Sequence, residues 1–216
     1  MTSITLVNSL AGLLILTSLL VIEVKHPRWS ALMYSLQSMV LVGIFLVLAY
    51  STKAEQLYLW AASAFVTKVV LVPWILYGAL SKVGDPEKPR NVLGTTLSFL
   101  LAALAVTVSF LVINQIQLKA AEPFKPALAV SMAHFFFGEL CILTQRNLFK
   151  QLLGFCLMEN GSHLTLALLA YNAPELVEIG IATDAVFGVV IMVALGNQIY
   201  KNLHTLDTSD LSTLKG

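Results

Sequence analysis

The sequence predicts an all-α integral membrane protein with about seven transmembrane helices. Of its 216 residues, 57% are hydrophobic and only 12% are charged, and the mean hydropathy is +0.82. Ordinary soluble domains are about half apolar and about a quarter charged. A soluble domain of this length has no interior large enough for so much apolar surface, so lipid must be the solvent for much of it.

Seven apolar stretches are long enough to cross a bilayer, which takes about 20 residues of helix. They are residues 3–23, 30–51, 57–80, 94–114, 126–144, 148–170 and 176–199. Pro126 and Pro174 stand at expected helix starts, where a missing N–H costs little. No basic residue precedes the first stretch, so we expect a retained helix rather than a cleaved signal.

The distribution of basic residues predicts the orientation. Most of them fall after the first, third and fifth spans or in the tail, namely Lys25, Arg28, Lys82, Lys88, Arg90, Arg146, Lys150, Lys201 and Lys215. The opposite side carries only Lys53, Lys119 and Lys125. We therefore expect a periplasmic N-terminus and a cytoplasmic C-terminus, which agrees with an odd number of spans.

Three regions are expected along the chain. They are a four-helix membrane region at 1–120, a three-helix region at 121–200 and a polar cytoplasmic tail at 201–216. Parallel landmarks in residues 28–68 and 146–184 suggest that the first three and the last three spans are same-direction repeats. The alignment needs gaps, so unrelated halves are the alternative. The tail is expected either to dock on a cytoplasmic partner or to be disordered.

Ionisable side chains inside the expected spans are the main functional signal. They are Lys68, Glu139, Glu159 and Asp184. Each costs about 2.5–3.5 kcal/mol when it is ionised and unpaired at the bilayer centre. At about 1.5 Å of rise per residue, all but Glu139 lie near the midplane, and Glu139 is nearer the cytoplasmic end. These side chains must therefore face protein or water, pair with one another, or stay neutral.

This set of residues predicts a proton path. A buried lysine beside a carboxylate can exchange a proton near neutral pH, which is the chemistry that a relay needs. His163 lies one helical turn from Glu159 and is either a relay partner or a satisfied polar group. Asp184 stands in a stripe of glycines, which can also be read as a packing seam. For all the charges together, the alternative is static ion pairs that fix helix register.

The sequence gives no indication of nucleic-acid binding, metal binding or catalysis. The net charge of +1 does not indicate a basic surface for binding nucleic acid. Cys141 and Cys156 lie in apolar stretches and are expected to be small buried hydrophobes. No set of His, Cys, Asp and Glu has metal-ligand spacing, and no phosphate-binding loop or nucleophile elbow is present. We therefore expect no catalytic site, metal or cofactor in this chain.

The C-terminal half resembles subunit K of bacterial respiratory complex I, a three-helix proton-channel subunit. The resemblance rests on residues 145–148, 153–160, 182–188 and 209–216. That family carries a membrane glutamate on each of its last two helices, and these are thought to relay protons between antiporter-like neighbours. By this resemblance Asp184 occupies the second position. Cys156 stands at the first position, and Glu159, one turn further along the same face, is the expected substitute.

The whole chain is similar to the membrane E components of hydrogenase-4 complexes, of the formate hydrogenlyase-2 type, most clearly at residues 156–163 and 174–185. This resemblance implies a non-catalytic inner-membrane subunit of a bacterial group 4 nickel–iron hydrogenase. Its partners would be antiporter-like and quinone-channel-like membrane subunits, with nickel–iron and iron–sulfur centres in peripheral hydrogenase subunits. The implied function is lateral proton translocation driven by redox chemistry in those partners. The alternatives are a structural clamp that conducts no ions and a free-standing transporter.

Overall fold

The computed structural model describes residues 3–83, 92–117, 119–171 and 175–213, and within these ranges it contains helices and no strand. The helices are α1 Ser3–Glu23, α2 Pro27–Thr52, α3 Gln56–Ala64, η1 Phe65–Leu71, α4 Val72–Val83, α5 Thr95–Gln115, η2 Lys119–Phe124, α6 Lys125–Thr144, α7 Leu148–Leu169, α8 Glu175–Leu203 and η3 Asp210–Thr213. Because α3, η1 and α4 are continuous, the described ranges contain seven helices that are long and apolar enough to cross a membrane. The chain is a multi-pass membrane protein.

The expected spans are confirmed to within a few residues. The prediction was wrong mainly at three ends: α2 begins at Pro27, α4 continues to Val83, and α8 continues to Leu203. Pro27 suits the first turn of a helix, where its missing N–H has no intrahelical partner to lose. Pro126 does lie in the first turn of α6, whereas Pro174 falls outside the described residues.

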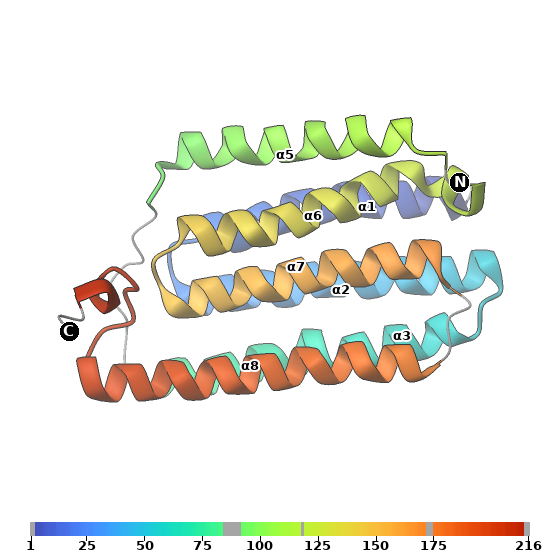
Figure 1. Ribbon diagram of the computed structural model, residues 1–216. Helices are drawn as coiled ribbons and strands as arrows, with labels where there is room; N and C mark the ends of the chain where they lie inside the picture. Colours follow the sequence, from blue (N-terminus) through green and yellow to red (C-terminus); the bar gives the residue numbers. More distant parts are fainter. Residues whose placement is uncertain (1–2, 84–91, 118, 172–174, 214–216) are drawn as a thin grey trace.

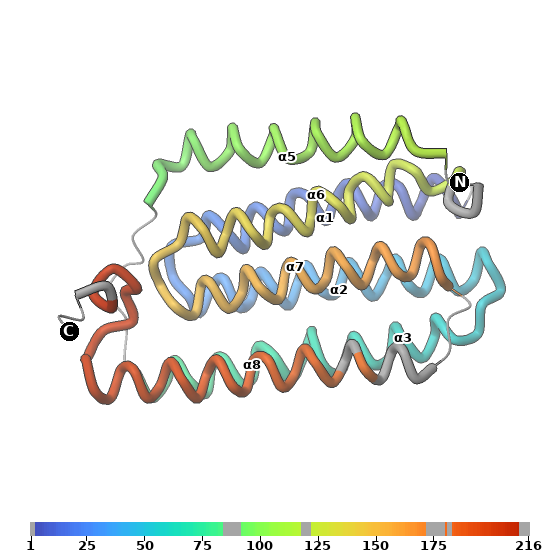
Figure 2. Tube along the Cα trace, in the orientation of Figure 1, coloured from blue at the N-terminus to red at the C-terminus, as the bar shows by residue number. Residues whose placement is uncertain are grey.

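Two layers of three spanning helices lie side by side, and α5 packs outside them against α6 (Figure 1). α1 contacts α6, α2 contacts α7 and α4 contacts α8, and the two helices of each pair run in the same direction (Figure 2). A duplication of the first three and last three spans would produce this arrangement. The duplication itself stays a prediction.

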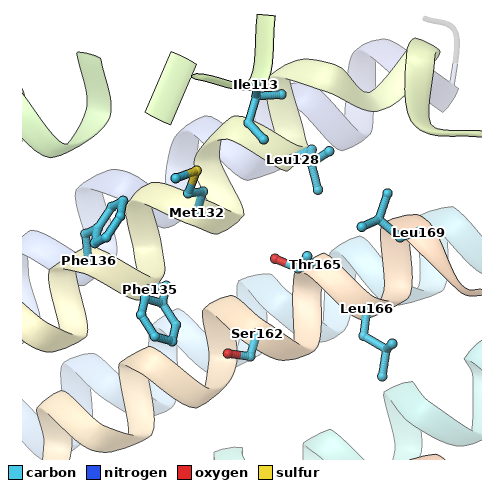
Figure 3. Close-up of a pocket in the computed structure, with 9 residues that line it drawn as sticks. All are labelled: Ile113, Leu128, Met132, Phe135, Phe136, Ser162, Thr165, Leu166 and Leu169. Carbon is cyan, nitrogen blue, oxygen red and sulfur yellow. The ribbon is translucent and has the colours of Figure 1, made fainter. Parts of the chain in front are cut away.

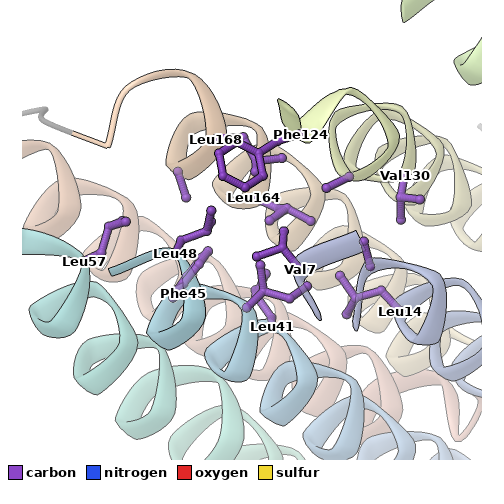
Figure 4. Packing of buried hydrophobic residues seen from close by; sticks show 14 of the residues in the cluster. Val7, Leu14, Leu41, Phe45, Leu48, Leu57, Phe124, Val130, Leu164 and Leu168 are labelled. Atoms are coloured by element: carbon purple, nitrogen blue, oxygen red, sulfur yellow. The ribbon is translucent and has the colours of Figure 1, made fainter. Parts of the chain in front are cut away.

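Two apolar clusters fill opposite ends of the bundle. The first joins α1, α2, α3, α6 and α7 and includes Phe45, Leu48 and Leu164 (Figure 4). The second lies toward the other ends of these helices, where α4 and α8 join them, and includes Tyr34 and Phe137. Between the two clusters lies a level of buried polar side chains, formed by Ser18, Gln37, Ser38, Lys68, Ser131, His134, Asn160 and His163.

α6 and α7 approach each other closely at glycines, which positions α7 within the bundle. A Cβ added at Gly161 would lie 2.6 Å from the backbone nitrogen of Phe135, and one at Gly154 would lie 2.8 Å from the carbonyl oxygen of Gly138. Small residues at such contacts let helix backbones approach in a membrane. The close approach of these two helices brings polar side chains of both to the same level.

The C-terminal segment folds back on its own chain. Leu206 is buried, its carbonyl accepts from Leu148 N at 3.0 Å, and Thr208 N donates to the carbonyl of Arg146 at 2.8 Å. This part of the tail is ordered rather than disordered, and its docking on a cytoplasmic partner stays a prediction. The segment packs against the loop between α6 and α7, because Leu206 reaches the second apolar cluster.

Candidate functional site

Lys68 lies midway along its spanning helix, in a segment of π geometry, η1. Pro73 has no N–H to donate to the carbonyl of Val69, and Ser35 of α2 donates to that oxygen instead, at 2.8 Å. π segments are rare and often lie at functional sites. This π turn was not predicted from the sequence.

Lys68 forms a buried ion pair with Glu159 of α7. The Lys68 Nζ lies 2.6 Å from Glu159 Oε1, and the two side chains are 1% and 14% exposed. A second N–H of Lys68 donates to Asn160 Oδ1 at 2.8 Å. A buried charge that loses its partner is strongly destabilising, so the two charges account for each other's presence in this apolar bundle.

A chain of hydrogen bonds continues from Asn160 across the bundle. Asn160 Nδ2 donates to Gln37 Oε1 on α2 at 2.8 Å, and Gln37 Nε2 lies 3.1 Å from His134 Nε2 on α6. His134 Nδ1 in turn lies 2.7 Å from Ser18 Oγ on α1. One connected polar chain therefore runs from the ion pair to α1, between the two apolar clusters.

His163 is not hydrogen-bonded to Glu159 and is not a satisfied polar group among the described residues, and its role as a relay partner stays a prediction. Neither of its ring nitrogens has a hydrogen-bond partner within the described part of the chain. The ring is instead buried against Phe45 and Trp60, with centroid distances of 4.9 and 5.4 Å. The apolar ring contacts hold this side chain, although it also lines a cavity with Glu159.

Asp184 lies on the exposed face of α8 and makes no ion pair in the described ranges. It lines a cavity of about 410 Å³ between α7 and α8, together with Glu159 and His163. The structure thus brings Asp184 to the same cavity as Glu159, without direct contact. A Cβ at Gly188, one turn along α8, would lie 3.1 Å from the ring of Phe155, so the glycine stripe also serves close packing.

Glu139 lies apart from this site. It is half-buried on α6, about 8 Å from the end of that helix, and it takes no part in the chain of hydrogen bonds that leads from Lys68. Among the residues that the structure describes, no three His, Cys, Asp or Glu side chains gather closely enough to hold a metal ion.

Sequence reasoning missed several buried polar residues. Gln37, Asn160 and Ser18 were not weighed because they carry no charge, although a buried amide inside an apolar span was a visible signal. Lys150 was assigned to a loop but is buried in the first turn of α7. Its Nζ donates to the carbonyls of Val21, Ile22 and Val24 at 2.6–2.8 Å, at the C-terminal end of α1.

A second hollow, of about 550 Å³, lies between α6 and α7 beside Ile113 of α5 (Figure 3). Apart from the hydroxyls of Ser162 and Thr165, the side chains that line it are apolar. It contains no ionisable side chain and therefore has none of the chemistry of the Lys68 site.

Comparison with known proteins confirms both resemblances drawn from the sequence. The chain is 51% identical to hydrogenase-4 component E of Escherichia coli K12 and of Shigella flexneri, over 100% of this chain and of theirs. It is also 23% identical to an uncharacterized protein of Mycobacterium tuberculosis, over 97% of this chain and 96% of that protein. Residues 126–216 match the family of NADH-ubiquinone/plastoquinone oxidoreductase chain 4L. No solved structure matches the chain.

Proposed function

Because the chain belongs to the family of hydrogenase-4 component E, we propose that it is a non-catalytic membrane subunit of a bacterial group 4 nickel–iron hydrogenase of the formate hydrogenlyase type. It contributes acid and base groups to a lateral proton path. Redox chemistry in peripheral subunits, which hold the nickel–iron and iron–sulfur centres, drives that path. We expect no cofactor in this chain itself, and we place it in the inner membrane with its C-terminus in the cytoplasm.

The buried pair of Lys68 and Glu159 carries this proposal. A buried ion pair is weak evidence for stability, whereas an acid and a base in hydrogen-bond contact can exchange a proton. When the Lys68 ammonium passes its proton to Glu159 Oε1 over 2.6 Å, a neutral amine and a neutral acid result. The total charge of the pair is unchanged, so this transfer creates no new net charge inside the bilayer.

The cavity between α7 and α8 supplies the next step of the path. Glu159 and Asp184 both line it, and about 410 Å³ is room for several water molecules. Glu159 Oε2 is buried and has no hydrogen-bond partner in the chain as described. Water in the cavity would satisfy this oxygen and carry a proton from Glu159 to the carboxylate of Asp184.

The exposed position of Asp184 supports a partner on this face. A carboxylate facing lipid costs about 2.5–3.5 kcal/mol, yet Asp184 is exposed in the isolated chain. We infer that an antiporter-like membrane subunit covers α8 here and continues the proton route. The quinone-channel-like subunit would then occupy another face of the bundle.

Substitution of the two acids tests the proposal in the assembled complex. We expect Glu159→Gln and Asp184→Asn each to lower proton movement per complex about ten-fold or more, because a titratable link is lost. Glu55→Gln, in an exposed loop, is the matched control and should behave as wild type. The proposal is wrong if both acid variants keep wild-type redox turnover and wild-type proton movement.

A structural clamp is the second candidate function. Large apolar side chains are exposed on α5 and α8, including Leu100, Leu104, Phe187 and Leu195, and such surfaces suit contact with other membrane subunits as well as with lipid. A clamp predicts that Glu159→Gln and Asp184→Asn lower the yield of assembled complex. The activity of each complex that does assemble would then be unchanged.

A further inference from the structure

The hydrogen-bond chain beside Lys68 has a single direction, which the lysine sets. An ammonium only donates, so Asn160 must turn Oδ1 toward it, and Asn160 Nδ2 then donates to Gln37 Oε1. Gln37 therefore presents its Nε2 to His134. Because that amide nitrogen also only donates, His134 Nε2 accepts.

The far end of the chain fixes the same direction independently. Ser18 has one hydroxyl proton and donates it to the carbonyl of Leu14 at 2.5 Å. It must then accept from His134, so Nδ1 carries the hydrogen and Nε2 is free to accept from Gln37. This tautomer of a neutral imidazole follows from its partners. The two ends agree, and together they determine every amide orientation between them.

We infer that Gln37 and His134 are positioning residues that hold the Lys68 ammonium on Glu159 Oε1. Asn160 Nδ2 donates to Gln37 Oε1 at 2.8 Å and to Ser38 Oγ at 3.2 Å, and Ser38 Oγ itself donates to Gln37 Oε1 at 3.3 Å. Gln37 Oε1 is therefore the shared acceptor that keeps Asn160 Oδ1 turned toward Lys68. Gln37 keeps this orientation because its Nε2 has an acceptor in His134. With the Gln37 amide reversed, N–H groups of Asn160 and Gln37 would face each other, and buried donors would be left without acceptors.

The placement of the amides is well suited to this role. Lysine has a flexible side chain with several rotatable bonds, so one contact to Glu159 does not define the position of its ammonium. Asn160 follows Glu159 on α7, and its Oδ1 supplies a second acceptor at 2.8 Å. Gln37 is fully buried, so no solvent is available to replace its bonds. A network that is fully satisfied in a low-dielectric interior is rigid.

Carbodiimide labelling of Glu159 in the resting, assembled complex tests this inference without requiring turnover. A carbodiimide adds to a protonated carboxylic acid to give an N-acylurea, which mass spectrometry of the peptide detects, and it reacts poorly with a carboxylate held by an ammonium. Lys68→Met is the reference for a released acid. We expect Gln37→Met and His134→Phe to raise the labelling rate about ten-fold, toward that reference, because a larger fraction of Glu159 becomes protonated.

The conservative variant His134→Gln separates positioning from bulk structure. Its amide can accept from Gln37 and donate to Ser18, so the labelling rate should stay within about two-fold of wild type. Thr17→Val is the matched control, because the Thr17 hydroxyl donates only within its own helix, to the carbonyls of Leu13 and Leu14. Its labelling rate should equal that of wild type.

Three results would overturn the inference. One is slow, wild-type labelling in Gln37→Met while Lys68→Met labels fast, which would mean that the lysine is held without the amide chain. Another is fast labelling in His134→Gln equal to that in His134→Phe. The third is no effect of Lys68→Met. The role of these residues in transport rests on the proposed function. If labelling changes as expected while Glu159→Gln still moves protons normally, the positioning stands and the proposed function fails.

Discussion

Lys68 and Lys150 are buried to the same extent, 1% exposed each, and differ in what they contact. Lys68 meets a carboxylate midway along the bundle. Lys150 meets three backbone carbonyls at the end of α1 and the hydroxyl of Ser30. Carbonyls at a helix C-terminus carry partial negative charge, but they are not bases that take up a proton near neutral pH.

The different partners of Lys68 and Lys150 show that a buried lysine is not necessarily a transport residue. Lys150 closes a helix end by satisfying carbonyls that have no intrahelical partner, and it forms no ion pair within the described residues. Lys68 has an acid as its partner, so its charge can be exchanged. The chemistry of the partner, rather than depth in the membrane, separates the two roles.

Proton movement should show the largest difference between the two lysines. Lys68→Met should lower proton movement per assembled complex about ten-fold or more, because the base of the pair is lost. Lys150→Met should leave it within about two-fold of wild type, because Lys150 forms no ion pair with an acid within the described residues. Proton uptake by membrane vesicles, divided by the amount of assembled complex, measures both. Equal losses in the two variants would contradict the comparison.

Stability should reveal how the Lys68 pair is held. Lys68→Met should lower the free energy of unfolding by roughly 3 kcal/mol or more, because Glu159 loses its partner and must either stay ionised while buried or take up a proton. The double variant Lys68→Met with Glu159→Gln should recover most of that loss. Unfolding of the detergent-solubilised chain, followed by circular dichroism, measures both. A double variant as unstable as the single one would mean that the pair does not couple.

Lys150→Met should destabilise the fold by about 2 kcal/mol, since hydrogen bonds from a charged donor contribute about 1.5–3 kcal/mol each and water can replace part of them at this helix end. The control is Lys201→Met, which removes an exposed lysine near the end of α8. That control should change the free energy of unfolding by less than about 0.5 kcal/mol. If the two substitutions cost the same, Lys150 does not hold the end of α1.

Glycine substitutions sharpen the contrast between the inner helix α7, which carries both Lys150 and Glu159, and the outer helix α8. Gly161→Ala should cost about 1–3 kcal/mol, because the new methyl group would lie 2.6 Å from the backbone of Phe135. Gly180→Ala on α8 has nothing within 4 Å and should be neutral or slightly stabilising. Thermal unfolding of the two variants compares them, and a larger loss at Gly180 would contradict the observed packing.

Much of the fold was predictable because lipid imposes a simple rule. A span must be long and apolar, so hydrophobic length alone located all seven helices. Lys68 and Glu159 were found for the same reason, since any ionisable residue in an apolar stretch stands out. Lys150 was misplaced because it lies three residues into α7. At that depth a buried lysine and a loop lysine look alike in sequence.

What could not be predicted depends on which faces meet. Gln37 and His134 come together with Asn160 only through the packing of α2, α6 and α7, and no spacing within one helix reveals that contact. The exposure of Asp184 depends on how α8 packs against α7. The aromatic surroundings of His163 likewise come from α2 and α3.

The π segment around Lys68 holds one residue more than an α-helix would over the same turns. Its hydrogen bonds skip one more residue than those of an α-helix, as shown by the bond from Val72 N to the carbonyl of Thr67. Deleting a single residue between 65 and 71 would let the segment relax to an ordinary α-helix. The helix on either side would keep its facing, whereas the side chains within the segment, Lys68 among them, would change direction. The π turn therefore bears on where Lys68 points rather than on how the flanking turns pack.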